Sequence, residues 1–72
     1  MADELAPEVA PWLNTFAARL GTDPPSAEEI DLLLSLAGAA ARASARQAAP
    51  VACWLAAKAG VDPAQALELA QS

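Results

Sequence analysis

Alanine is the residue that most constrains the fold of this chain. It supplies 21 of the 40 hydrophobic residues in a sequence of 72. Alanine has the highest helix propensity of all residues, and the Leu, Glu, Gln and Arg residues around it rank close behind. Val and Ile are sparse and never alternate with polar residues, so no strand pattern is present. The composition therefore predicts an all-α fold.

The same alanine content limits the core that such a fold can build. Only Trp12, Phe16 and Trp54 are aromatic, and the core of a domain of this size rarely supplies more than about 3–5 kcal/mol. The single Cys53 allows no internal disulfide, and there is no His. We therefore expect residues 11–72 to form one helical domain behind a flexible leader, residues 1–10, and to gain stability by association.

Helix-capping residues divide the chain into four predicted helices. The first starts at Pro11 and ends at Gly21, and the second spans about 27–46 behind a Ser26–Glu29 capping box. The third runs from Pro50 to Gly60, and the fourth starts at Pro63 behind Asp62, with Gln65 completing a second box. This order predicts a small bundle arranged as two helical hairpins, the second shorter, joined near residues 47–50.

Side-chain spacing predicts which helix faces are buried. Residues at i, i+4 and i+8 share one face of a helix. By this rule one face of the first helix holds Trp12, Phe16 and Leu20, the third helix turns Val51, Trp54 and Leu55 inward, and Leu67 with Ala70, or Leu69, forms the buried edge of the fourth. Ala37, Ala41 and Ala45, beside Gly38, leave a face on the second helix that another helix of this chain or of a second copy can approach closely.

The sequence also contains a possible repeat at an offset of 39 residues. The matching positions in the first copy are Pro11, Ala17, Ala18, Gly21, Asp23, Pro24, Ala27 and Glu29. Duplication explains this match, and so does convergence, because any two helical hairpins share a proline start, a glycine stop and an aspartate cap. The predicted architecture is the same under both explanations.

Charge and residue content argue against several classes of function. A net charge of −5 opposes nucleic-acid binding, which needs clustered Lys and Arg. Without His, neither Cys53 nor any Ser has the usual activating base, so no catalytic residue is predicted. The acidic cluster of Glu28, Glu29 and Asp31 has a structural explanation in the dipole of the second helix. We therefore expect no metal site and no cofactor.

The ends and the hydropathy of the chain bear on its location. The first residues are acidic where a secretory signal needs basic residues. The most apolar stretch, residues 32–41, is much shorter than the roughly 20 residues of a membrane span. We therefore expect a cytoplasmic protein, and an unpaired Cys53 suits that reducing compartment.

The joint between the two predicted hairpins is the candidate partner-binding site. Arg42 and Arg46 are four residues apart, which places them side by side on a helix, and they are the only paired cations of an acidic chain. Arg and Trp are common at interface hot spots. The candidate site consists of Arg42, Arg46, Gln47, Pro50 and Trp54. Stabilisation of helix ends by Arg, and burial of Trp54 in the core, remain as structural alternatives.

Four segments resemble a small bacterial helical domain family of unknown function, which is found alone or behind a molybdenum cofactor guanylyltransferase. They are, in order, Trp12-Leu13, Leu20-Gly21, the run from Asp31 to Ala37, and the run from Arg46 to Val51. The chain has one additional residue after Asp31. It also has Gln47 where that family tends to have Pro, and Arg42 where His is common, which replaces a switchable cation by a permanent one.

The resemblance implies an accessory role close to molybdenum cofactor assembly, without the transfer chemistry. We therefore expect a non-catalytic interaction module whose protein partner is a molybdenum cofactor guanylyltransferase. The alternative is a self-associating structural homodimer that has no enzyme partner. Composition does not separate these two hypotheses.

Overall fold

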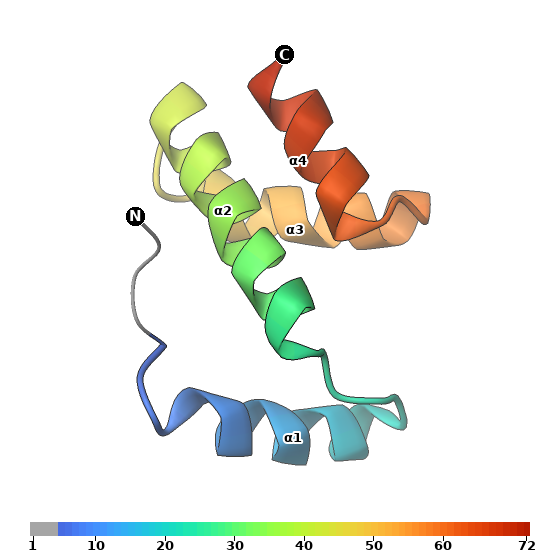
Figure 1. Cartoon of the computed structure of the whole chain (residues 1–72). Coiled ribbons are helices and arrows are strands. Elements are labelled where there is room, and N and C mark those ends of the chain that lie inside the picture. The colour runs from blue at the N-terminus through green and yellow to red at the C-terminus, as the bar shows by residue number, and fades with distance from the viewer. Residues whose placement is uncertain (1–4) are drawn as a thin grey trace.

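A computed structural model describes residues 5–72 as four α-helices joined by short connections (Figure 1). The helices are α1 (Val9–Leu20), α2 (Ala27–Ala43), α3 (Ala48–Ala59) and α4 (Pro63–Gln71). No strand occurs within residues 5–72, which confirms the all-α prediction. No helix of this described part is long and apolar enough to cross a membrane. Residues 1–4 of the predicted leader lie outside the described residues, so its flexibility stays a prediction.

Helices α1 and α3 are built alike. Each has 12 residues and ends at a left-handed glycine, Gly21 at φ 77° and Gly60 at φ 75°. Each begins two residues before the predicted proline start. The first four N–H groups of a helix have no partner within it, so Pro11 and Pro50 fit the third position without loss of a hydrogen bond. The predicted starts were therefore two residues late.

The two copies of the possible repeat have the same structure in these two helices and differ after them. Asp62 caps α4 by accepting a hydrogen bond from the Gln65 N–H at 3.0 Å. Its counterpart Asp23 lies in the connection, and Ser26 caps α2 instead. Ser26 and Glu29 form the predicted reciprocal capping box, with N–H to oxygen distances of 2.8 and 3.1 Å.

Helix α2 ends at Ala43, three residues before the predicted end at Arg46. The Ser44 N–H still bonds to the Ala40 carbonyl, but Ser44 leaves helical geometry at φ −135° and ψ −92°. The next carbonyls already serve α3: the Ala48 N–H donates to Ala45 at 2.9 Å, and the Ala49 N–H donates to Arg46 at 3.1 Å. Residues 45–47 thus form the entry turn of α3.

The core lies where α2 packs against both α3 and α4. The buried side chains are Leu36 and Ala39 of α2, Ala66 of α4 and Ala17 of α1. Helix α3 contributes small half-buried side chains: Ala48, Ala49, Ala52, Cys53 and Ala56. Small residues let helix axes approach closely, and this contact places α3 against α2. The predicted small face of α2 is half-buried at Ala37 and Ala41, whereas Ala45 lies beyond the helix and is exposed.

The large residues of α3 were predicted on the wrong face, and the buried edge of α4 was predicted correctly only in part. Val51, Trp54 and Leu55 are 54–59% exposed, because the small residues of α3 occupy its contact with α2. In α4, Leu67 is half-buried as expected, but Ala70 and Leu69 are both exposed. Among residues 5–72, most of the large apolar side chains therefore lie outside the core.

The helices do not pair as two hairpins. In Figure 1 α1 lies crosswise below α2, and α4 lies beside α2 and runs in the same direction, rather than along α3. Helix α1 does not pair with α2 because of the connection from Gly21 to Ser26. A residue before proline avoids helical geometry, so the Asp23-Pro24-Pro25 segment is extended and holds α1 away from α2. A three-residue connection, residues 60–62, directs α4 away from α3.

Candidate partner-binding surface

The structure places all five predicted site residues, Arg42, Arg46, Gln47, Pro50 and Trp54, on the exposed surface. They come from the end of α2, the entry turn and the first half of α3. Gln47, Pro50 and Trp54 are spaced by three and four residues, so they follow one side of α3. The site is therefore continuous with the outer face of α3. It does not lie at a joint between two hairpins, which is where the sequence predicted it.

The two arginines do not lie on one helix, so the spacing rule that predicted a side-by-side pair does not apply to them. That spacing rule needs one continuous helix, and α2 ends between them. The Arg42 side chain lies over Gly38. A Cβ atom added to Gly38 would be 3.1 Å from the Arg42 Nη1 atom. Arg42 is also in the last turn of α2, where a cation offsets the negative end of the helix dipole. Arg46 lies in the entry turn, beyond the end of α2, so it does not offset the dipole of that helix.

The outer face of α3 is an apolar surface with a cation at one end. It consists of Val51, Trp54 and Leu55, followed by Lys58. The Lys58 ammonium lies 4.8 Å from the centroid of the Trp54 ring, within range of a cation–π interaction. This contact orients the indole on the outside of the helix. An exposed, oriented Trp bordered by cations is the kind of group that anchors protein interfaces.

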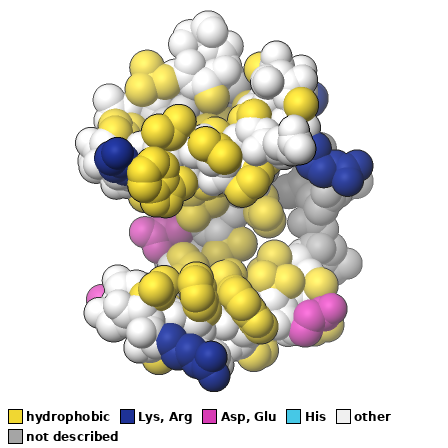
Figure 2. Space-filling model, turned by 180° about the vertical axis from the view of Figure 1, so that it is seen from behind, with side chains coloured by type: hydrophobic (Ala, Val, Ile, Leu, Met, Phe, Trp, Pro, Cys, Tyr) yellow, Lys and Arg dark blue, Asp and Glu magenta, His cyan; other side chains and the backbone are white. Residues whose placement is uncertain are grey.

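A second apolar face lies on α1. Trp12, Phe16 and Leu20 are 62%, 44% and 63% exposed, and the Trp12 and Phe16 rings stack with centroids 5.0 Å apart. Figure 2 shows hydrophobic side chains along both sides of a hollow between α1 and the other helices, with Lys and Arg side chains at its borders. The spacing of this α1 face was predicted, but its exposure was not, since amphipathic spacing alone does not say what covers a face.

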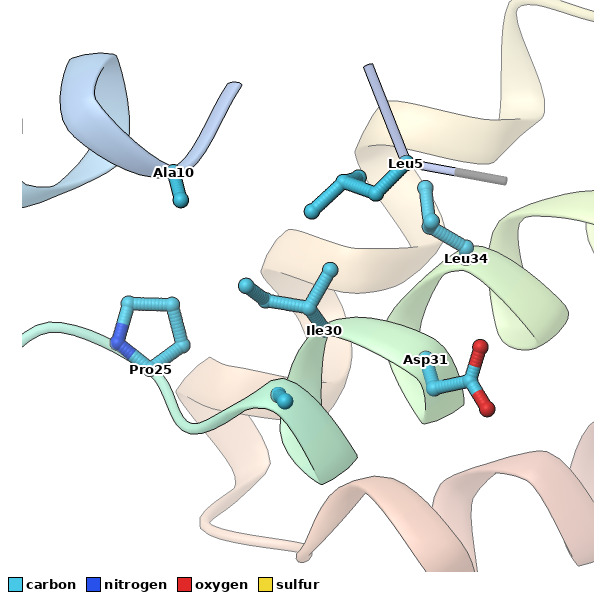
Figure 3. Close-up of a pocket in the computed structure, with 7 residues that line it drawn as sticks. Leu5, Ala10, Pro25, Ile30, Asp31 and Leu34 are labelled. Atoms are coloured by element: carbon cyan, nitrogen blue, oxygen red, sulfur yellow. The ribbon is translucent and has the colours of Figure 1, made fainter. Parts of the chain in front are cut away.

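A pocket of about 450 Å³ occupies the space between the start of α1 and the start of α2. Its lining residues are Leu5, Ala10, Pro25, Ala27, Ile30, Asp31 and Leu34. In Figure 3 Leu5, Ile30 and Leu34 converge, while the Asp31 carboxylate points away from them. Small-molecule sites combine an apolar wall with several convergent polar groups, and this pocket has one carboxylate directed elsewhere. It is therefore an apolar hollow left where α1 stands away from α2.

Cys53 lies on the side of α3 that faces α2. Its thiol donates a long hydrogen bond, 3.8 Å, to the Leu33 carbonyl. Burial raises the pKa of Cys53 above its ordinary value of 9.0, the direction opposite to that of an activated nucleophile. Among residues 5–72 no three His, Cys, Asp or Glu side chains are grouped so that they could hold a metal ion. Cys53 therefore acts as a small apolar side chain in the contact between α3 and α2.

These features define a small all-helical domain with two exposed apolar helix faces and a cationic joint. A family model for a domain of unknown function, DUF6457, matches residues 4–71, and the chain belongs to this family. The match covers nearly the whole chain, including all four helices. No curated protein and no solved structure matches the chain.

Proposed function

We propose that this domain is a non-catalytic interaction module that binds a protein partner through the joint and the adjoining outer face of α3. The observation that carries the proposal is the exposure of Trp54, 59%, while the buried residues of the described part, 5–72, are three alanines and one leucine. A protein with so few large side chains would gain most stability by burying them, and here they lie outside. Exposed apolar groups rimmed by charge are typical of interaction sites.

The partner implied by the sequence resemblance is a molybdenum cofactor guanylyltransferase. The accessory role follows from the resemblance, and the chemistry of the surface adds a property of that partner. Arg42 lies in the last turn of α2, Arg46 in the entry turn of α3 and Lys58 in the last turn of α3, so the complementary surface carries carboxylates around an apolar patch. The transfer reaction belongs to the enzyme, and the module contributes binding alone.

The experiment is a titration of the purified domain into the purified guanylyltransferase, followed by calorimetry. We expect binding by the unmodified domain and a loss of affinity of roughly tenfold or more for the variant Arg42→Gln with Arg46→Gln. The matched control is Gln65→Glu with Gln71→Glu, which changes the net charge by the same amount on α4. We expect the control to bind like the unmodified domain.

The contradicting results are equally definite. No heat of binding from the unmodified domain overturns the enzyme as partner and favours the self-associating alternative. Equal weakening by the control and the arginine variant reduces the effect to net charge and removes the joint as the docking site.

A further inference from the structure

The apolar faces of α1 and α3 lie on one side of the molecule. Helix α3 lies behind α2 in Figure 1 and therefore faces the viewer in Figure 2, where hydrophobic side chains of α1 and of the upper helices are visible together. The large exposed side chains are Trp12, Phe16 and Leu20 on α1, and Val51, Trp54 and Leu55 on α3. One partner surface is therefore able to cover both faces at once.

The area of this surface suits a stable dimer. Aromatic side chains bury about 150–250 Å² each, and large aliphatic ones somewhat less. At the observed exposures, 44–63%, the six side chains present roughly 600 Å² of apolar surface. With flanking atoms this approaches the ~800 Å² per partner of a standard interface. Closed oligomers of identical chains are mostly twofold dimers, in which one surface contacts itself.

The helix directions allow two arrangements of two copies, and these arrangements pair the charges of α1 differently. Helices α1 and α3 run in the same direction across the molecule (Figure 1). A twofold axis perpendicular to them sets each helix antiparallel to its own copy. Glu8 directly precedes α1 and Arg19 is in its last turn, so this arrangement puts unlike charges together at both ends. At α3 the same axis brings Lys58 toward Arg46 of the second copy, which is a like pair. An axis along the helices would bring Arg19 toward Lys58, also a like pair, and Glu8 toward Arg46. The two arrangements therefore differ at α1, where only the first places unlike charges together at both ends.

We propose that a second copy of this chain covers this surface, with α1 packed antiparallel on α1 and α3 on α3. In this register Glu8 lies opposite Arg19 of the second copy, and Trp12 lies opposite Phe16 of the second copy. The intramolecular stack of Trp12 on Phe16 presents the two rings as a preformed ridge. Antiparallel α1 helices also align their dipoles favourably. The inference does not rest on the enzyme partner, although both surfaces include Trp54.

Charge reversal at α1 tests the register. Sedimentation equilibrium of the unmodified chain should give a dimer at micromolar concentrations. Glu8→Arg and Arg19→Glu should each raise the dissociation constant roughly tenfold, because twofold symmetry turns two attractive pairs into two repulsive ones. The double variant should return to within about threefold of the unmodified chain, since both pairs are restored with exchanged signs. Glu68→Arg on α4 is the control and should leave the dissociation constant unchanged.

If Glu8 and Arg19 only stabilise helix α1 and make no contact with a second copy, the three variants should rank differently. Glu8 and Arg19 each suit the helix dipole of α1, so exchanging both should lower helix stability most in the double variant. Circular dichroism measures that loss separately from association. A monomer up to about 1 mM, or a double variant that dimerises no better than the single ones, overturns the proposal. These variants leave Arg42 and Arg46 intact, so unchanged capture of the guanylyltransferase would show that only the dimer had failed.

Discussion

The Cys53 thiol donates to the Leu33 carbonyl across the contact of α3 with α2, at 3.8 Å, while the adjacent Trp54 points outward and is 59% exposed. Consecutive helix residues differ by about 100° in direction, so a helix that buries one turns the other toward its flank. In α3 the smaller side chain occupies the contact. This choice keeps the two helices close and leaves the largest side chain of α3 for a partner.

The burial of Cys53 has a consequence for its reactivity. Because its pKa is raised, the thiolate fraction at pH 8 should be smaller in the folded chain than in urea. Alkylation by iodoacetamide should therefore be slower in the folded state. The Cys53 thiol holds its proton more tightly in the folded chain than in the unfolded chain. The stability that this protonated thiol contributes is therefore complete below pH 9.0 and is lost as the pH rises above that value. Cys53→Ser should abolish the decline, and equal alkylation rates with and without urea would contradict the prediction.

Replacing Gly21 and Gly38 by alanine should change the free energy of unfolding in opposite directions. Gly21 has φ 77°, a conformation that side chains rarely adopt, so Gly21→Ala should lower the free energy of unfolding by about 1 kcal/mol although its Cβ would meet nothing. Gly38 is inside α2, and there the added Cβ meets only the mobile end of Arg42, at 3.1 Å. Gly38→Ala should stabilise the chain by about 0.5 kcal/mol. Urea unfolding measures both changes, and a gain for Gly21→Ala would refute the left-handed cap.

The stability of the chain should depend on the buried Leu36 far more than on the exposed Leu69. Leu36 is 3% exposed where α2 packs, so Leu36→Ala should cost about 2–5 kcal/mol, comparable with the whole stability of a domain of this size. Leu69→Ala removes the same atoms from a side chain that is 63% exposed and should cost less than about 0.5 kcal/mol. Thermal unfolding of the two variants gives the comparison. Similar losses would mean that Leu69 is covered too.

Local signals in the sequence predicted the helices well. The Ser26–Glu29 box, the Asp62 cap and the two glycine stops each depend on a few neighbouring residues, and the structure contains all of them. Of the second predicted box only the Asp62 half is present, with the Gln65 N–H as donor. The end of α2 was missed because the entry turn of α3 takes the carbonyls of Ala45 and Arg46, a competition that capping patterns do not describe.

Side-chain direction was harder to predict because α3 is apolar on most of its surface. A helix with Ala52 and Ala56 on one side and Val51 and Leu55 on the other has no polar face to mark the outside. Hydrophobicity favours burying the larger set, whereas close approach to α2 favours the smaller. The second effect prevails, and it also explains why the candidate site gained Val51 and Leu55, which the sequence had assigned to the core.

Acrylamide quenching of tryptophan fluorescence, measured on the unmodified chain from nanomolar to high micromolar concentration, tests the central claim most directly. The claim is that Trp12 and Trp54 belong to an interface rather than to the core of a single copy. At 62% and 59% exposure both should be readily quenched in the most dilute samples, and quenching should fall as a second copy covers them. Weak quenching that is already present at the lowest concentration, and that does not change as the concentration rises, would contradict the account.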